Sequence, residues 1–153
     1  MANELNRFRR VLHVREVERE ITQGELATKM REEESILDRL NEIKAKRESA
    51  LTEFCSGRDC LVSPQQIWFE RQNLDLIEKR LGEDKHDLED CRAQIEETKG
   101  VLLEKHRNVQ IMEHFVDKLK VRQGKKAVDD EQNNLDDINS MRYRRNMNEE
   151  ARF

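Results

Sequence analysis

An apolar residue recurs at every seventh position over a long stretch of this sequence. A strict seven-residue period makes a helix present one continuous apolar seam to a second helix under a left-handed supercoil. The sequence therefore predicts a coiled coil. Its seam consists of Ile67, Leu74, Leu81, Leu88, Ile95, Leu102, Val109 and Val116.

The second line of this seam lies three residues further on in each repeat and is only partly apolar. It reads Ile77, Asp84, Cys91, Thr98, Lys105, Met112 and Leu119. A zipper of two identical parallel helices favours apolar residues on both lines. We therefore expect the partner to be a helix of different character, from an upstream part of the same chain.

The start of the second helix is marked by the only proline in the chain. Ser63 has the side chain of a helix cap, Pro64 suits the first helical position and Gln66 can close a capping box. Gly57 and its short polar neighbours are typical of a chain that leaves a helix C-terminus. These signals predict a turn over about residues 55–63.

Upstream of this turn, apolar residues recur at three- and four-residue steps, as on one face of a helix. The predicted fold class is therefore all-α, as a long antiparallel two-helix coiled-coil hairpin with helices over about 4–54 and 64–140. When the two helices are laid antiparallel about the turn, Leu40 lies opposite Leu81, whereas Glu33 lies near Leu88. We call this pairing the predicted register. We expect the middle of the hairpin to be its weakest packed region.

No linker or internal repeat beyond the heptad interrupts the sequence, so we expect a single coiled-coil domain over residues 1–153. The second helix is the longer arm and continues past the first as a charged overhang. The last stretch, about 142–153, is predicted to fray.

Composition limits the possible functions. Only 35% of the residues are apolar and 41% are charged, which provides an apolar stripe but no globular core or catalytic cleft, so we expect no enzyme and no cofactor. A net charge of −4 argues against general affinity for nucleic acid. Neither a membrane span of ~20 apolar residues nor the apolar core of a signal peptide is found. We expect a cytoplasmic protein without direct membrane insertion.

The three cysteines form no regular framework, which fits a reducing compartment. Cys55 and Cys60 flank the turn and can bridge under oxidation, but we expect no functional disulfide. Two thiols without a nearby histidine do not complete the tetrahedral shell of zinc, so we expect no metal site. Cys91 falls on the seam and is predicted to be a small buried side chain.

Two arginine clusters are candidate binding residues, Arg7, Arg9, Arg10 and Arg15 in the first helix and Arg142, Arg144 and Arg145 near the C-terminus. Basic residues in a first helical turn oppose the helix dipole, which favours a partner surface over a merely solvated face. Trp68 and Phe69 directly follow the seam residue Ile67, so they cannot both point into the seam. At least one should be exposed and available to a partner, the alternative being packing against Phe54.

Laid out in this way, the chain resembles the YscO and FliJ family, the small central-stalk proteins of type III secretion and flagellar export systems. The residues that carry the resemblance are the basic-hydrophobic start from Leu5 to Leu12, the polar turn, and Ile67-Trp68 opening a long heptad helix. The resemblance covers roughly residues 4–140. The start and the length are closer to the injectisome YscO branch.

The resemblance implies a stalk that couples a hexameric type III secretion ATPase to the export gate, in the cytoplasm at the base of the secretion apparatus. Its terminal end would enter the bore of the ATPase ring, its turn end would point towards the cytoplasmic domain of the gate, and export chaperones are further partners. The ring contacts would be Arg7, Arg9, Arg10 and Arg15, and the gate contacts Asn73, Ile77, Arg80 and Asp84.

Two other classes of protein share parts of this pattern. A structural coiled-coil adaptor without ATPase coupling fits the same residues. A zipper-type DNA-binding protein needs a dense basic helix that runs directly into the heptads, whereas Ser63 and Pro64 precede Ile67 here. The sequence favours the export stalk, with the adaptor as the alternative.

Overall fold

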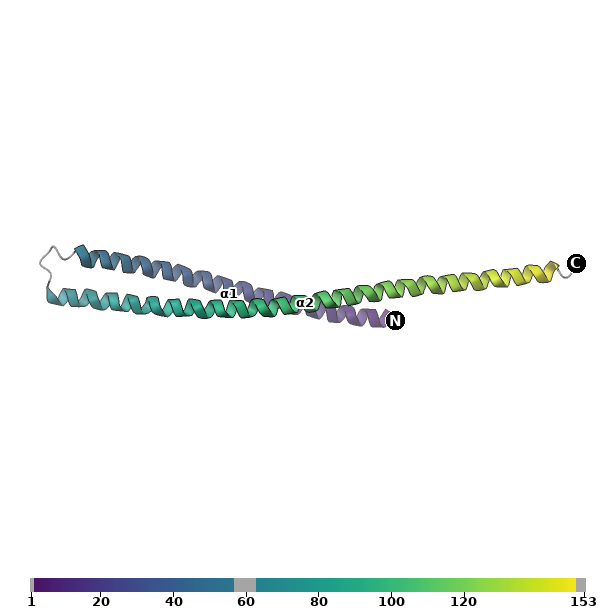
Figure 1. Ribbon diagram of the computed structural model, residues 1–153, viewed down its shortest axis with the longest axis horizontal. Coiled ribbons are helices and arrows are strands. Elements are labelled where there is room, and N and C mark those ends of the chain that lie inside the picture. Colours follow the sequence, from purple (N-terminus) through teal and green to yellow (C-terminus); the bar gives the residue numbers. More distant parts are fainter. Residues whose placement is uncertain (1, 57–62, 151–153) are drawn as a thin grey trace. The chain divides into compact units, whose positions relative to one another are not determined.

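A computed structural model describes residues 2–56 and 63–150 of the chain. Two long helices, α1 (Ala2–Ser56) and α2 (Pro64–Glu150), make up these ranges, without any strand (Figure 1). The helices pack against each other, which confirms the predicted all-α hairpin. The second helix continues to Glu150, past its predicted end near residue 140, because neither proline nor glycine follows Gly124 to end it.

The N-terminus of α2 has the predicted cap. The Gln66 backbone N–H donates to the Ser63 Oγ at 3.3 Å and to the Ser63 carbonyl oxygen at 3.0 Å, and the Ile67 N–H reaches the same carbonyl at 3.2 Å. Ser63 is therefore the cap and Pro64 the first helical residue. The centre of the predicted turn, residues 57–62 with Cys60, lies outside the described residues.

The chain divides into two compact units. The tip unit comprises Arg19–Glu104, and the terminal unit comprises the residues up to Glu18 together with those from Lys105 onward. Each unit contains a stretch of α1 and a stretch of α2. The single domain over 1–153 and the frayed end over 142–153 stay predictions.

In the tip unit, α1 and α2 run antiparallel. The Arg47 Nη2 lies 3.2 Å from the Glu78 Oε1, and the Arg39 Nη2 lies 3.5 Å from the Asp84 Oδ1, so residue numbers fall along α1 as they rise along α2. The predicted register placed Arg47 level with Leu74. Its guanidinium reaches Glu78, so that register holds to within about one helical turn.

The packed interior is a narrow stripe between the two helices. In the tip unit Leu40, Leu81, Cys91 and Ile95 are buried, and in the terminal unit Val109 and Val116 are buried. Of the other predicted seam residues, Leu74, Leu88 and Leu102 are half-buried, whereas Ile67 at the start of α2 is exposed. A two-helix structure buries only one stripe per helix, so most other side chains remain in water.

In the terminal unit, the first turns of α1 pack against α2 through an aromatic pair. The rings of Phe8 and Phe115 meet edge to face, with centroids 4.8 Å apart and an interplanar angle of 73°. Further along α2, every residue from Gly124 to Asn148 is exposed. We call this segment, Gly124–Asn148, the overhang.

Replacing Leu81, which is only 7% exposed, tests whether the seven-residue line holds the helices together. We expect Leu81→Asp to lower the free energy of unfolding by roughly 3 kcal/mol or more, because it places an unpaired charge in the apolar stripe. Glu89→Gln, an exposed control on the same helix, should change it by less than about 0.5 kcal/mol. Thermal unfolding followed by circular dichroism measures both, and equal melting temperatures for the two variants would contradict the seam.

Candidate functional site

The predicted ring-contact arginines lie on the first turns of α1, and all four are exposed. Arg7 and Arg10 line one shallow depression of the helix surface, and Arg9 and Arg10 line a second. Arg15 differs, because its Nη1 lies 3.4 Å from the Glu18 Oε2. In the described ranges the other three form no ion pair, so their positive charges are unneutralised.

A second row of cations comes from α2 in the same terminal unit. Lys118, Arg122 and Lys126 line a hollow of about 300 Å³, together with Leu5 and Phe8 of α1. Sequence reasoning missed this row, although a spacing of four residues places side chains on one face of a helix. Both helices thus present exposed cations in the terminal unit. We call these cations together the basic end, and they are Arg7, Arg9, Arg10, Lys118, Arg122 and Lys126.

An apolar surface is exposed at the start of α2, in the tip unit. Trp68 and Phe69 are 64% and 70% exposed, so both aromatics are solvent-accessible, where at least one was predicted to be. Leu76, which is 61% exposed, follows Phe69 by seven residues and therefore lies on the same side of the helix. That spacing was the signal that sequence reasoning overlooked. We call Trp68, Phe69 and Leu76 the tip apolar surface.

The structure divides the four predicted gate-contact residues into two kinds. Asn73 and Arg80 are exposed, whereas Ile77 and Asp84 are half-buried in the seam. The Asp84 carboxylate is held by Arg39, whose Nη2 lies 3.5 Å from the Asp84 Oδ1. At ~100° per residue, Asn73 and Arg80 fall in line with Phe69 and Leu76, so half of the predicted set adjoins the tip apolar surface.

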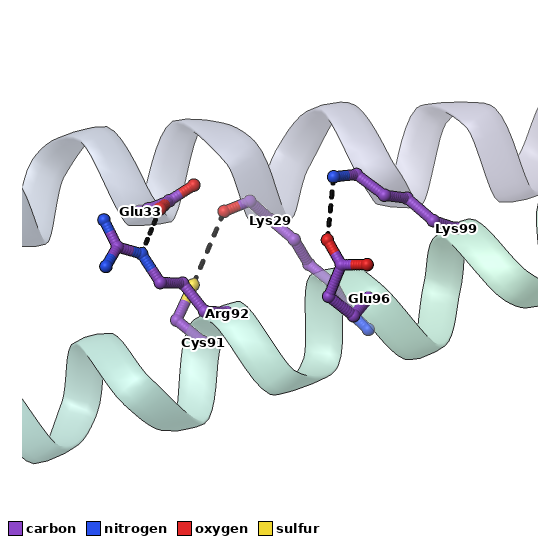
Figure 2. Close-up of polar contacts among 6 residues, drawn as sticks. All are labelled: Lys29, Glu33, Cys91, Arg92, Glu96 and Lys99. Carbon is purple, nitrogen blue, oxygen red and sulfur yellow. Dashed lines mark hydrogen bonds and ion pairs between the residues drawn. The ribbon is translucent and has the colours of Figure 1, made fainter.

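Polar side chains replace apolar ones along part of the seam in the tip unit (Figure 2). The Lys29 Nζ donates to the Thr98 Oγ1 at 2.8 Å, and the Cys91 thiol lies 3.6 Å from the Lys29 carbonyl oxygen. The Arg92 Nε donates to the Glu33 Oε1 at 2.7 Å. These cross-helix contacts form a polar layer, defined by Lys29, Glu33, Cys91, Thr98 and Arg92.

The polar layer lies in the expected middle of the hairpin. The predicted register placed Glu33 near Leu88, and the Cys91 thiol beside the Lys29 carbonyl oxygen agrees with that register. The Glu33 carboxylate accepts a hydrogen bond from the Arg92 Nε, one helical turn beyond Leu88, so its charge is paired on the exposed flank of the seam.

The two described cysteines lie in opposite environments. Cys91 is buried, as predicted, and Cys55 is exposed. Burial raises the pKa of the Cys91 thiol, the carboxylates of Glu32 and Glu33 raise it further, and the Lys29 ammonium opposes them. Across the described ranges, no group of three or more His, Cys, Asp or Glu side chains is placed to hold a metal ion.

Comparison with known families identifies the group of proteins to which this arrangement belongs. The family described as "Flagellar FliJ protein" matches residues 4–148, which include most of both helices. The chain belongs to the FliJ family. No curated protein and no solved structure matches it. The closer similarity to the injectisome branch stays a prediction.

FliJ-family membership confirms the resemblance drawn from the heptads and gives the chain a stalk-like role in flagellar or type III protein export. Members of this family are structural components of the export machinery. Neither α1 nor α2 has, within its described residues, a segment long and apolar enough to cross a membrane.

The difference between the two described thiols is measurable. We expect iodoacetamide to modify Cys55 at least about tenfold faster than Cys91 in the folded protein at neutral pH, because the Cys91 thiolate is disfavoured and covered. Mass spectrometry of the modified peptides gives the two rates. Equal rates would contradict a packed polar layer.

The same thiol gives a pH dependence with a definite sign. Because the pKa of Cys91 is raised in the folded chain, its contribution to stability is complete below the ordinary thiol pKa and is lost as the pH rises through the folded value. Between about pH 7 and pH 10 the wild type should therefore lose more thermal stability than Cys91→Ala. Parallel curves would contradict the shift.

Proposed function

We propose that this chain is the central stalk of a type III protein export system, coupling a hexameric export ATPase to the export gate. The observation that carries this proposal is the basic end, which two antiparallel helices build in a protein of the FliJ family. The stalk would act in the cytoplasm at the base of the export apparatus. Export chaperones would be additional partners.

The chemistry of the basic end suits a contact with an acidic or polar ring bore. Arg7, Arg9 and Arg10 form no ion pair in the described part of the chain, and the N-terminus of α1 adds the positive end of its dipole. Exposed charges of this kind steer and orient a partner more than they hold it. A shaft made of two unlike helices presents a different side to each subunit of a ring, and so biases its nucleotide sites one at a time.

The tip unit offers a different chemistry for the gate. Phe69 and Leu76 expose apolar side chains on one side of α2, and large exposed apolar residues are typical of binding hot spots. Asn73 and Arg80, two of the predicted gate residues, lie in the same row. We therefore place the gate contact on this row, with Trp68 beside it.

The alternative function is a structural coiled-coil adaptor that does not act on an ATPase. It accounts for the helices, the seam and the polar layer equally well. It gives no role to the unneutralised cations of the basic end. The two functions differ in one measurable property, the effect of the wild-type chain on ATP hydrolysis.

Reversing the free charges of the basic end tests the ring contact. We expect wild-type protein to stimulate the purified hexameric export ATPase of the same organism, and Arg7→Glu/Arg9→Glu/Arg10→Glu to abolish that stimulation while α1 stays helical. Arg15 is left unchanged because it pairs with Glu18. Phosphate release measures the rate, and the association should weaken with added salt.

The control variant is Arg31→Glu/Lys44→Glu/Lys46→Glu, which reverses three exposed charges of α1 in the tip unit. It should stimulate hydrolysis as the wild type does. Equal stimulation by both triple variants would show that the basic end is only a solvated surface. Failure of the wild type to stimulate at all would favour the adaptor.

Shortening the apolar side chains of the tip tests the gate contact. Phe69→Ala/Leu76→Ala should weaken binding to the purified cytoplasmic domain of the export gate at least about tenfold, because such anchors dominate interface energies. Leu103→Ala/Ile111→Ala, an apolar pair elsewhere on α2 that is 53% and 65% exposed, should bind as the wild type does. Calorimetry measures both affinities, and equal values would remove the gate from this row.

A further inference from the structure

An apolar stripe on α2 begins at Val121, just before the overhang, and continues along the overhang. No described part of α1 covers this stripe. Val121, Val128 and Leu135 recur at seven-residue intervals and are 59%, 60% and 59% exposed. At ~100° per residue they fall within about 40° of one another. Glu4 and Leu5 of α1 line a hollow with Arg122 and Lys126, and beyond this level every described residue of α2 from Gly124 onward whose burial is given is exposed.

This stripe is not a continuation of the hairpin seam. The seam line that includes Val116 continues through Gln123, Asp130 and Asp137, which are polar. The apolar line of the overhang lies on roughly the opposite side of α2. A seven-residue apolar repeat on a new face indicates a second helical partner.

The charges beside the stripe are segregated around its central residue. Before Val128 they are basic, namely Lys118, Lys120, Arg122, Lys125 and Lys126. After Val128 they are acidic, namely Asp129, Asp130, Glu131, Asp136 and Asp137. A second copy of this helix laid antiparallel, with the two Val128 residues level, therefore places basic residues against acidic ones over the whole overlap.

We propose that two copies of this chain associate through this stripe as an antiparallel pair with a two-fold axis at Val128. In this register Val121 packs against Leu135 of the second copy, and Val128 packs against Val128 of the second copy. The apolar pairing and the charge pairing agree on a single register. A parallel pair would instead stack like charges on like.

In this register, ion pairs between the two copies form along one side of the apolar stripe. Arg122, Lys125, Asp129 and Asp136 all lie on the same side of the stripe at ~100° per residue, and an axis of this kind brings the same sides together. Lys125 then meets the second copy's Asp129, and Arg122 meets its Asp136. None of these four forms an ion pair in the described part of the chain, although Lys120 does, with Asp117 at 3.2 Å.

The interface spans about two heptads per chain, which is small for a protein–protein contact. Interfaces of less than about 1,200 Å² are typical of transient complexes. We therefore expect a reversible dimer with a dissociation constant in the micromolar range. The dimer does not rest on the proposed role in export, although Arg122 belongs to both surfaces and could not serve both contacts at once.

Sedimentation velocity over low-micromolar to near-millimolar concentrations tests the dimer. The wild type should dimerise, and Val128→Glu should raise the dissociation constant at least about tenfold because it places two carboxylates together at the two-fold axis. Val128 is 60% exposed in the single chain, so circular dichroism should show an unchanged helix. Ile111→Glu, at a 65% exposed position off the stripe, should dimerise as the wild type does.

Mixing two charge variants tests the antiparallel register. Lys125→Glu alone and Asp129→Lys alone should each self-associate more weakly than the wild type, because each repels its own copy. An equimolar mixture should associate, because both cross-chain pairs are then of opposite charge. A wild type that stays monomeric, a Val128→Glu variant that dimerises normally, or a mixture no more associated than its components would overturn the proposal.

Discussion

Each of the two helices can bury only one stripe of side chains, and the rest of the structure depends on this constraint. The stripe cannot fill a globular core, and several large apolar side chains, among them Phe69 and Val128, stay exposed outside it. Leu40, Leu81 and Ile95 hold the tip unit, and Val109 and Val116 hold the terminal unit. Most other side chains of the described residues lie at the surface, with Thr22 and Thr98 among the buried exceptions, so the candidate contacts are charged and apolar side chains presented there.

The polar layer gives the antiparallel pairing a specificity that the apolar stripe lacks. Leucine and valine pack almost equally well after one helix slides by a turn, whereas sliding would leave the part-buried Lys29 ammonium without the Thr98 hydroxyl. An unpaired polar group in a part-buried seam costs more free energy than its hydrogen bond contributes. We infer that the polar layer fixes the register, with some loss of stability relative to an apolar seam.

The chemistry of the exposed surface differs between the two units of the chain. The terminal unit presents exposed cations on both helices, whereas the start of α2 in the tip unit exposes Phe69 and Leu76. Family membership establishes a stalk-like role in protein export, and our proposal assigns a charged contact to one surface and an apolar contact to the other. The overhang adds a third chemistry, since a dimer through Val128 would occupy a segment that α1 leaves uncovered.

The sequence by itself determined the fold class, the cap at Ser63 and the heptad line of α2, because periodicity and capping are local properties of the chain. It also pointed to the basic start of α1 and to the aromatics after Ile67. Only the tertiary structure decided which residues become neighbours across the helices. Lys118, Arg122 and Lys126 line one hollow with Leu5 and Phe8 of α1. The Glu33 carboxylate pairs with Arg92, and the Asp84 carboxylate pairs with Arg39. Such pairings depend on register, and a helical period specifies a face without specifying the level at which another helix meets it.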